Sequence, residues 1–323
     1  NLNNLTTEAA ALDSAIQAQN LQEQIATLYI QICYSTEAIN VNKESYKSSL
    51  ENEERGKEMV KIGKMSQADL AQLTAQRAQD EYSIVESESN VKNYKRQLKE
   101  LLQITNDEAF DIVVPTASDA QALGTIPSLN SVYASALDTR PEIKSYQNMI
   151  DQSDLNIAIA KAGKLPTISA NAGISTSTTS MNKDGWGSQI KQNFGVGGGI
   201  SVSIPICDNR ATKTAINKAN IQKQSSMLDL KDQQTKLYST IENYWLQANT
   251  NQSQFKAAKT STESAKTSYD LLSEQFKLGL KNIVELRTGK DNLLKAQQNE
   301  LQSKYLTLLN MGMLNFYKTG RVE

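Results

Sequence analysis

Residues 237–276 carry the clearest helical pattern of the chain and read LYSTIENYWLQANTNQSQFKAAKTSTESAKTSYDLLSEQF. Steps of four and three residues alternate through it, at Leu237, Ile241, Tyr244, Ala248, Asn251, Phe255, Ala258, Thr262, Ala265, Tyr269, Leu272 and Phe276. A strict 3.5-residue spacing keeps one side of a helix against a partner helix, which is typical of a coiled coil. No proline follows Pro205, so the spacing predicts one helix from about Asn209 to Lys277, roughly 100 Å long.

A second helix is expected to return beside the first. After Gly279 the apolar spacing resumes at Leu294, Leu301, Tyr305 and Leu308. Glycine releases the chain from helical torsion angles and is common just beyond helix ends. The sequence therefore predicts an antiparallel helical hairpin over residues 208–318.

An internal repeat relates this hairpin to the start of the chain. Gly63 and Gly279 are 216 positions apart, and the same offset places Asp69 and Leu70 on Glu285 and Leu286. It also places Leu21, Ile25 and Leu28 on Leu237, Ile241 and Tyr244. Two unrelated amphipathic hairpins also resemble each other through their heptads, but the matched turn favours a duplicated half-protein. We expect a first helical hairpin over residues 1–104.

The chain changes character between the two hairpins. Residues 105–130 contain Pro115, Pro127 and Gly124 among Thr, Ser and Asp residues, which predicts an irregular connection. Arg140-Pro141-Glu142 marks a helix start, because proline is favoured in the first helical turn. We assign residues 131–163 to a leading helix of the second repeat.

Residues 164–207 carry the alternation of a β-hairpin. Apolar and small polar side chains alternate over residues 167–175 and 196–206, on either side of a Ser/Thr/Asn/Gly-rich loop at 176–193. Such strands suit a membrane barrel, and an ordinary hairpin half-buried on a soluble domain has the same composition. The adjoining long helix favours the membrane, with this predicted lipid-facing set: Ile168, Ala170, Ile200, Val202 and Ile204.

Composition excludes several classes of function. The 34 basic and 35 acidic side chains nearly cancel, whereas nucleic-acid-binding proteins usually carry a basic surface. The chain has no histidine, which removes the commonest general base and metal ligand. We expect no enzyme, no cofactor and no bound metal. Cys33 and Cys207 are either small apolar side chains or a disulfide pair.

Three motifs resemble the TolC family of outer-membrane efflux proteins. They are Arg140-Pro141-Glu142, Lys164-Leu165-Pro166-Thr167-Ile168-Ser169-Ala170 and Val202-Ser203-Ile204-Pro205-Ile206-Cys207-Asp208. The turn Phe276-Lys277-Leu278-Gly279, followed by Ile283-Val284-Glu285-Leu286, resembles the helical tip of that family.

The resemblance implies a mainly α fold with a β-hairpin, built as a trimer from two structural repeats per protomer. Long helices form a coiled-coil α-helical barrel in the periplasm, and hairpins form a twelve-stranded transmembrane β-barrel. The 216-residue offset places a first-repeat β-hairpin before Asn1, so this chain resembles a family member without roughly its first hundred residues.

The resemblance also implies partners and sites. The protein is expected to be a passive exit duct in the Gram-negative outer membrane, a homotrimer contacting lipid and fed by an inner-membrane RND or ABC-type pump through a periplasmic adaptor (membrane fusion protein). Asp69, Lys281 and Glu285 correspond to the periplasmic constriction, although Thr288 stands where some relatives have another acid and Phe276 replaces a tip tyrosine. The adaptor-docking turns correspond to Ile62, Gly63, Lys64, Leu278, Gly279 and Leu280. The alternative is a soluble periplasmic coiled-coil adaptor or structural spacer.

Overall fold

The computed structural model describes residues 2–105, 110–115 and 117–321 of the chain. Within them lie eight helices and two strands: α1 (Leu2–Lys61), α2 (Gln67–Leu101), α3 (Asp119–Ala122), α4 (Leu129–Thr139), α5 (Pro141–Ala162), β1 (Thr167–Ser175), α6 (Trp186–Gln192), β2 (Gly195–Ser203), α7 (Ala211–Lys277) and α8 (Ile283–Thr319). The chain divides into two compact units, Asn1–Ala11 with Lys144–Asp232 and Leu12–Ile143 with Gln233–Glu323. The prediction of a mainly α fold with one β-hairpin is confirmed.

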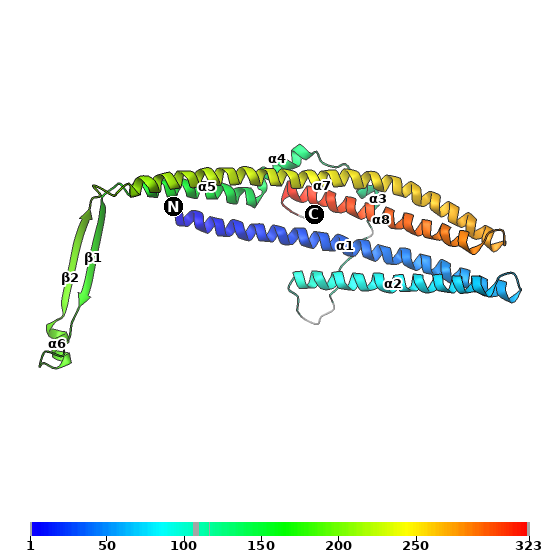
Figure 1. Cartoon of the computed structure of the whole chain (residues 1–323), viewed down its shortest axis with the longest axis horizontal. Helices are drawn as coiled ribbons and strands as arrows, with labels where there is room; N and C mark the ends of the chain where they lie inside the picture. The colour runs from blue at the N-terminus through cyan, green and yellow to red at the C-terminus, as the bar shows by residue number, and fades with distance from the viewer. Residues whose placement is uncertain (1, 106–109, 116, 322–323) are drawn as a thin grey trace. The chain divides into compact units, whose positions relative to one another are not determined.

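The second unit contains two antiparallel helical hairpins, α1–α2 and α7–α8, which lie side by side with their turns at the same end (Figure 1). Gly63 and Gly279 occupy the left-handed region in these turns, with φ of 71° and 76°. The heptad positions of α7 pack inside this unit, because Leu237, Ile241, Phe255 and Tyr269 are all buried. Tyr244 and Leu272 are half-buried.

Within each hairpin one glycine allows a close approach of the two helices. A Cβ on Gly56 of α1 would lie 2.6 Å from Leu73 Cδ1 of α2. A Cβ on Gly289 of α8 would lie 2.6 Å from Leu272 Cδ1 of α7. The 216-residue offset relates Gly56 to Leu272 and Leu73 to Gly289. Glycine and leucine therefore exchange places between the two hairpins while the contact itself is kept.

The connection between the hairpins is more ordered than the sequence indicates. Of the predicted irregular stretch 105–130, residues 106–109 and 116 lie outside the described part of the chain. Helix α3 forms within it, and its capping box joins Ser118 to Gln121.

The stretch assigned to one leading helix, residues 131–163, belongs to two helices, α4 and α5. Arg140 separates them with an extended backbone (φ −71°, ψ 127°). The break is expected because a residue before proline is disfavoured in the helical region.

The first unit holds α5, the beginning of α7 and the β-hairpin. Lys223 of α7 pairs with Asp154 of α5 at 2.7 Å, and the hydroxyls of Ser153 and Ser226 lie 3.3 Å apart. Strands β1 and β2 pair antiparallel from Thr167↔Ser203 to Ser175↔Gly195. The short helix α6 occupies part of the predicted loop 176–193.

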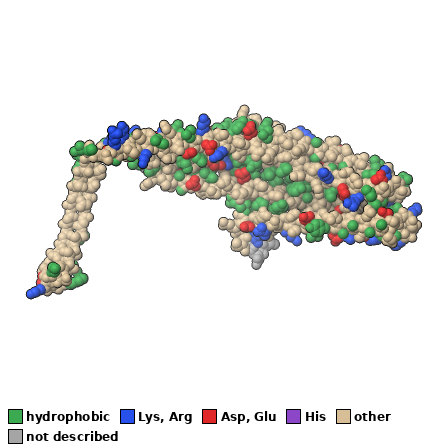
Figure 2. All heavy atoms as spheres, viewed as in Figure 1, with side chains coloured by type: hydrophobic (Ala, Val, Ile, Leu, Met, Phe, Trp, Pro, Cys, Tyr) green, Lys and Arg blue, Asp and Glu red, His purple; other side chains and the backbone are tan. Residues whose placement is uncertain are grey.

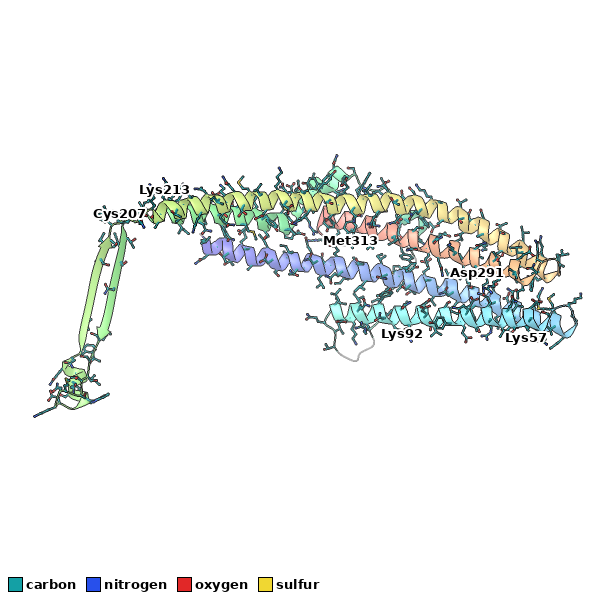
Figure 3. The ribbon with its side chains drawn as sticks, in the orientation of Figure 1. Lys57, Lys92, Cys207, Lys213, Asp291 and Met313 are labelled. Atoms are coloured by element: carbon teal, nitrogen blue, oxygen red, sulfur yellow. The ribbon has the colours of Figure 1, made fainter. Side chains whose placement is uncertain are left out.

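The junction between β2 and α7 is a tight turn. Asn209 and Arg210 have positive φ values of 49° and 64°. Asp208 Oδ2 accepts the backbone N–H of Thr212 at 2.8 Å, which satisfies an otherwise free donor of the first helical turn. Cys207, labelled in Figure 3, is exposed at this junction, Cys33 is buried, and both are free thiols. None of the helices formed by the described residues is long and apolar enough to cross a membrane.

Candidate functional site

The turn between α1 and α2 carries the first group of predicted site residues. Lys64 N–H donates to Met59 O at 2.8 Å and Gly63 N–H donates to Val60 O at 3.0 Å, which closes the end of α1. Ser66 caps α2, and its hydroxyl accepts the N–H of Asp69 at 3.1 Å and donates to Asp69 Oδ2 at 2.7 Å. Ile62, Gly63 and Lys64 are exposed.

The turn between α7 and α8 repeats this construction. Leu280 N–H donates to Gln275 O at 2.9 Å across the turn. Asn282 and Glu285 form a reciprocal capping box at the start of α8. Leu278 and Leu280 are 73% and 70% exposed, so both turns present apolar side chains to solvent.

The predicted constriction residues therefore occupy equivalent places at the two helix starts. Asp69 and Glu285 both lie three residues after a capping side chain, where the helix dipole favours acids. Lys281 Nζ lies 2.5 Å from Glu285 Oε1 of its own turn. The hydrogen bond from Lys281, together with one from the backbone N–H of Asn282, holds the pKa of Glu285 below its usual value. A link from Lys281 to Asp69 in another copy stays a prediction.

An apolar cluster lies behind the two turns. Leu73, Tyr269, Phe276, Ile283 and Leu286 are buried together, with Met65 and Leu293 packed against them. Phe276, which the sequence placed at the tip, is 3% exposed and belongs to this cluster. The cluster joins α2, α7 and α8, so it fastens one hairpin to the other near the turns.

Farther from the turns the hairpins meet through polar side chains, which we call the polar seam: Ser45, Ser48, Ser49 and Asn52 of α1, Asp80 of α2, Tyr269 of α7 and Lys290 of α8. Lys290 Nζ forms an ion pair with Asp80 and also donates to Ser49 Oγ and to Ser45 O. The hydroxyls of Tyr269 and Ser48 lie 2.6 Å apart.

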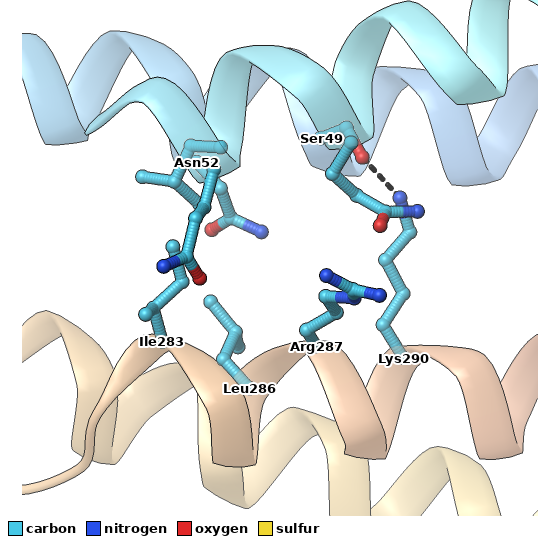
Figure 4. A pocket seen from close by; sticks show the side chains of 9 residues that line it. Ser49, Asn52, Ile283, Leu286, Arg287 and Lys290 are labelled. Atoms are coloured by element: carbon cyan, nitrogen blue, oxygen red, sulfur yellow. Dashed lines mark hydrogen bonds between the residues drawn. The ribbon is translucent and has the colours of Figure 1, made fainter. Parts of the chain in front are cut away.

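A cavity of about 20 Å³ adjoins the polar seam between the two hairpins. Ser49, Asn52, Ile283, Leu286, Arg287 and Lys290 face it in Figure 4, which also marks the bond from Lys290 to Ser49. That volume has room for about one water molecule.

Sequence reasoning missed the Asp80–Lys290 pair, although a signal was present. Lys290 continues the spacing of Ile283, Leu286 and Leu293 by steps of three and four, and Asp80 follows Leu73 by seven residues. Both charges therefore stand at positions of a helical seam, where a charged side chain is unusual.

The β-hairpin carries the predicted lipid-facing residues. In the register Ile168 opposes Val202 and Ala170 opposes Ile200, so these four side chains share one face of the two-stranded sheet. Ile168 is 72% exposed and Ile200 is 79% exposed. Figure 2 shows one face of the β-hairpin, and along the two strands this face is almost entirely tan, as expected of the face that carries Ser, Thr, Asn and Gly. Ile204 lies beyond the end of β2 and is exposed.

Comparison with known proteins relates this arrangement to one family. The family model for outer membrane efflux proteins matches residues 132–311, which is more than half of the chain. The chain belongs to the outer membrane efflux protein family.

The curated relatives that the chain matches first are distant in sequence. Toxin and drug export protein A of Aggregatibacter actinomycetemcomitans is 22% identical over 308 residues, which cover 92% of this chain and 63% of that protein. The chain spans under two thirds of the length of the curated relatives that it matches first.

Solved structures share the fold of this chain. The structure of CusC matches with a TM-score of 0.82 and 15% identity, over 98% of this chain and 72% of that chain. The Campylobacter jejuni outer membrane channel CmeC matches with a TM-score of 0.76 and 18% identity, over 98% and 66%.

Proposed function

We propose that this chain is part of one protomer of an outer-membrane channel, the passive exit duct of a tripartite efflux or secretion system. An inner-membrane RND or ABC-type pump delivers the substrate through a periplasmic adaptor, and the channel itself performs no catalysis. Membership in the outer membrane efflux protein family carries the proposal. This membership favours a channel over a soluble adaptor or spacer, since the long helical hairpins by themselves fit either kind of protein.

The assembly we propose is a homotrimer whose hairpins complete a transmembrane β-barrel and whose long helices form a tunnel in the periplasm. The exposed apolar face of the β-hairpin supports contact with outer-membrane lipid, and its Ser/Asn/Gly face suits a polar lumen. The equivalent turns at Gly63 and Gly279 and the exchanged Gly–Leu contacts support two structural repeats per protomer.

We also propose that the two turns dock the adaptor and that the acids beside them form the periplasmic constriction. Exposed Ile62, Leu278 and Leu280 supply apolar contact area. In the proposed trimer, Asp69 and Glu285 of three copies would put six carboxylates around one opening. Lys281 then offsets part of their mutual repulsion.

The assembly is tested by isolating the protein, expressed from its complete gene, from cell envelopes. The proposal predicts that extraction requires detergent and that light scattering of the purified protein gives the mass of three chains. A monomer released by osmotic shock without detergent contradicts the channel and supports the soluble adaptor.

A further inference from the structure

Basic side chains surround the junction between the β-hairpin and its two helices. Lys161 lies in the last turn of α5 and Lys164 lies between α5 and β1. Arg210 lies just before α7 and Lys213 lies in its first turn. All four are exposed, and Figure 2 shows basic side chains gathered where the strands meet the helices. We call these four residues the basic collar.

The fold brings the two halves of the basic collar together from segments that are distant in the sequence. A Cβ on Gly163 would lie 3.5 Å from the side chain of Thr212, so the chain before β1 touches the first turn of α7. The strand register begins at Thr167↔Ser203, which keeps the two segments adjacent. The positive charges of both segments therefore lie around one junction.

Neighbouring acids do not offset the charge of the basic collar. Residues 155–166 and 204–213 contain four basic side chains and a single acid, Asp208. That carboxylate accepts the backbone N–H of Thr212 at 2.8 Å and so caps α7. Within the part of the chain that the structure describes, none of the four basic side chains forms an ion pair. The collar is therefore a surface with an unbalanced positive charge.

Apolar side chains accompany the basic collar at the same junction. Leu165 and Ile204 are more than half exposed, and Ile206 is 96% exposed. Ile204 and Ile206 continue the apolar alternation of β2 beyond Val202 at steps of two residues. Exposed apolar and basic side chains meet in this way at the boundary between acyl chains and headgroups, where long basic side chains extend to the phosphates.

We propose that the basic collar binds the phosphate headgroups of anionic phospholipids. Ammonium and guanidinium groups bind phosphate strongly, and clustered basic residues beside a membrane segment attract anionic lipid. A zwitterionic headgroup carries its own cation, so it gains less from the collar. The proposal rests on the proposed channel function, which places the helices in the periplasm and the junction at the periplasmic leaflet.

The opposite end of the β-hairpin provides a matched control. Its loop carries Lys183 and Lys191, and both are exposed. Lys183→Gln/Lys191→Gln therefore removes the same charge as Lys164→Gln/Lys213→Gln, from the same hairpin but away from the junction. Glutamine at exposed positions keeps the length and polarity of the side chains, so both double variants are expected to fold.

The test measures which lipid lies beside the junction. Protein expressed from the complete gene carries a donor fluorophore on Cys207, which is exposed at the junction, whereas Cys33 is buried. Any exposed cysteine outside this chain is replaced by serine. The protein is inserted into vesicles with equal parts of phosphatidylglycerol and phosphatidylcholine, in which a trace of one lipid or the other bears an acceptor on its acyl chain. Energy transfer to the two acceptors gives the ratio of the lipids at the junction.

The basic collar predicts an excess of phosphatidylglycerol at the junction of the wild-type protein at low salt. Lys164→Gln/Lys213→Gln lowers the ratio at least about fivefold, the contribution of one basic side chain near an anionic surface. Lys183→Gln/Lys191→Gln keeps the wild-type ratio. High salt lowers the wild-type ratio, because exposed charges are screened.

Three results overturn the proposal. Equal transfer to the two lipids in the wild-type protein shows no preference for anionic lipid. An equal fall in both double variants shows an effect of net charge alone. A loss of trimer in Lys164→Gln/Lys213→Gln with an unchanged ratio assigns the collar to contacts with another copy of the chain.

Flotation of the protein with the vesicles separates this proposal from the proposed function. Inserted trimers without a preference for phosphatidylglycerol contradict the lipid site alone. Protein that floats only with phosphatidylglycerol and is released by high salt, without insertion, supports the lipid site and contradicts the channel. Protein that floats with neither lipid contradicts both.

Discussion

At the scale of single residues, Arg140 fixes the break between α4 and α5. Its side chain is 2% exposed and its guanidinium makes two hydrogen bonds to Glu142, at 2.6 Å and 3.1 Å. The guanidinium carbon lies 4.4 Å from the ring centroid of Tyr317 and 5.1 Å from that of Phe316. One side chain thus connects the break to the end of α8 by ion pairing and cation–π contact.

We predict that Arg140→Ala lowers the free energy of unfolding by about 3 kcal/mol, because the buried pair with Glu142 and both ring contacts are lost. Arg140→Lys recovers only part of this, since an ammonium cannot make the two-pronged contact. Arg96→Ala is the control, because Arg96 forms an exposed pair with Glu100 within α2 worth roughly 0.5 kcal/mol. Unfolding midpoints in denaturant compare the three, and equal midpoints for Arg140→Ala and Arg96→Ala contradict the assignment.

Local features of single residues could be predicted from the sequence, whereas long-range contacts could not. The proline after Arg140 made the helix start at Pro141 predictable, because that effect is local. The ring contacts and the Asp80–Lys290 pair were not predictable, because they join residues 176 and 210 positions apart. Nothing local to either charge shows which partner it meets.

At the level of elements, each helical hairpin has one glycine packed closely against a leucine of the opposite helix. Heptad spacing predicted their lengths well, with a helix expected from about Asn209 and observed from Ala211. The exchange of glycine and leucine between Gly56–Leu73 and Leu272–Gly289 was not apparent, because it requires both partners of each contact.

We predict opposite effects for two glycine substitutions within α8. Gly289→Ala places a Cβ 2.6 Å from Leu272 Cδ1, and we expect the overpacking cost of about 1–3 kcal/mol to exceed the helix-propensity gain of about 1 kcal/mol, so the unfolding midpoint falls. Gly312→Ala has no atom within 4 Å of the new Cβ and raises the midpoint, since alanine is favoured over glycine in a helix by about 1 kcal/mol.

Exchanging the leucine and the glycine of this contact tests it in a second way. Leu272→Gly/Gly289→Leu recreates the arrangement of the first hairpin, so its loss of stability is smaller than the sum for the two single variants. Additive losses contradict the proposed equivalence of the hairpins.

The β-hairpin gives an element-scale prediction for membrane assembly. Val202→Arg places a charge on the proposed lipid face one residue from the end of β2, so it lowers trimer assembly at a cost below the about 2–4 kcal/mol expected at the bilayer midplane. Ser203→Arg, on the opposite face, is tolerated. The yield of trimer in the outer membrane measures both, and equal yields contradict the assigned orientation.

At the scale of the whole molecule, both the fold class and the family were predictable from the sequence. The ordered motifs from Arg140 to Asp208 pointed to the family that the match over residues 132–311 shows. The roles of the site residues were harder to predict from the sequence. Asp69 and Glu285 each make a local capping contact, and that contact is sufficient to explain an acid at each position. The constriction role that we propose for them depends on contacts between copies of the chain.

The proposed channel is tested by recording single-channel current through a planar lipid bilayer from wild-type protein and from Asp69→Ala/Lys281→Ala. We predict discrete openings without nucleotide or pump, and a larger conductance in the variant with trimer assembly intact, because exposed links of about 0–1 kcal/mol each hold the constriction. Folded, detergent-extracted trimers of both proteins that leave the bilayer impermeable would contradict the channel. Openings of equal conductance would retain the channel and reduce these charges to helix caps.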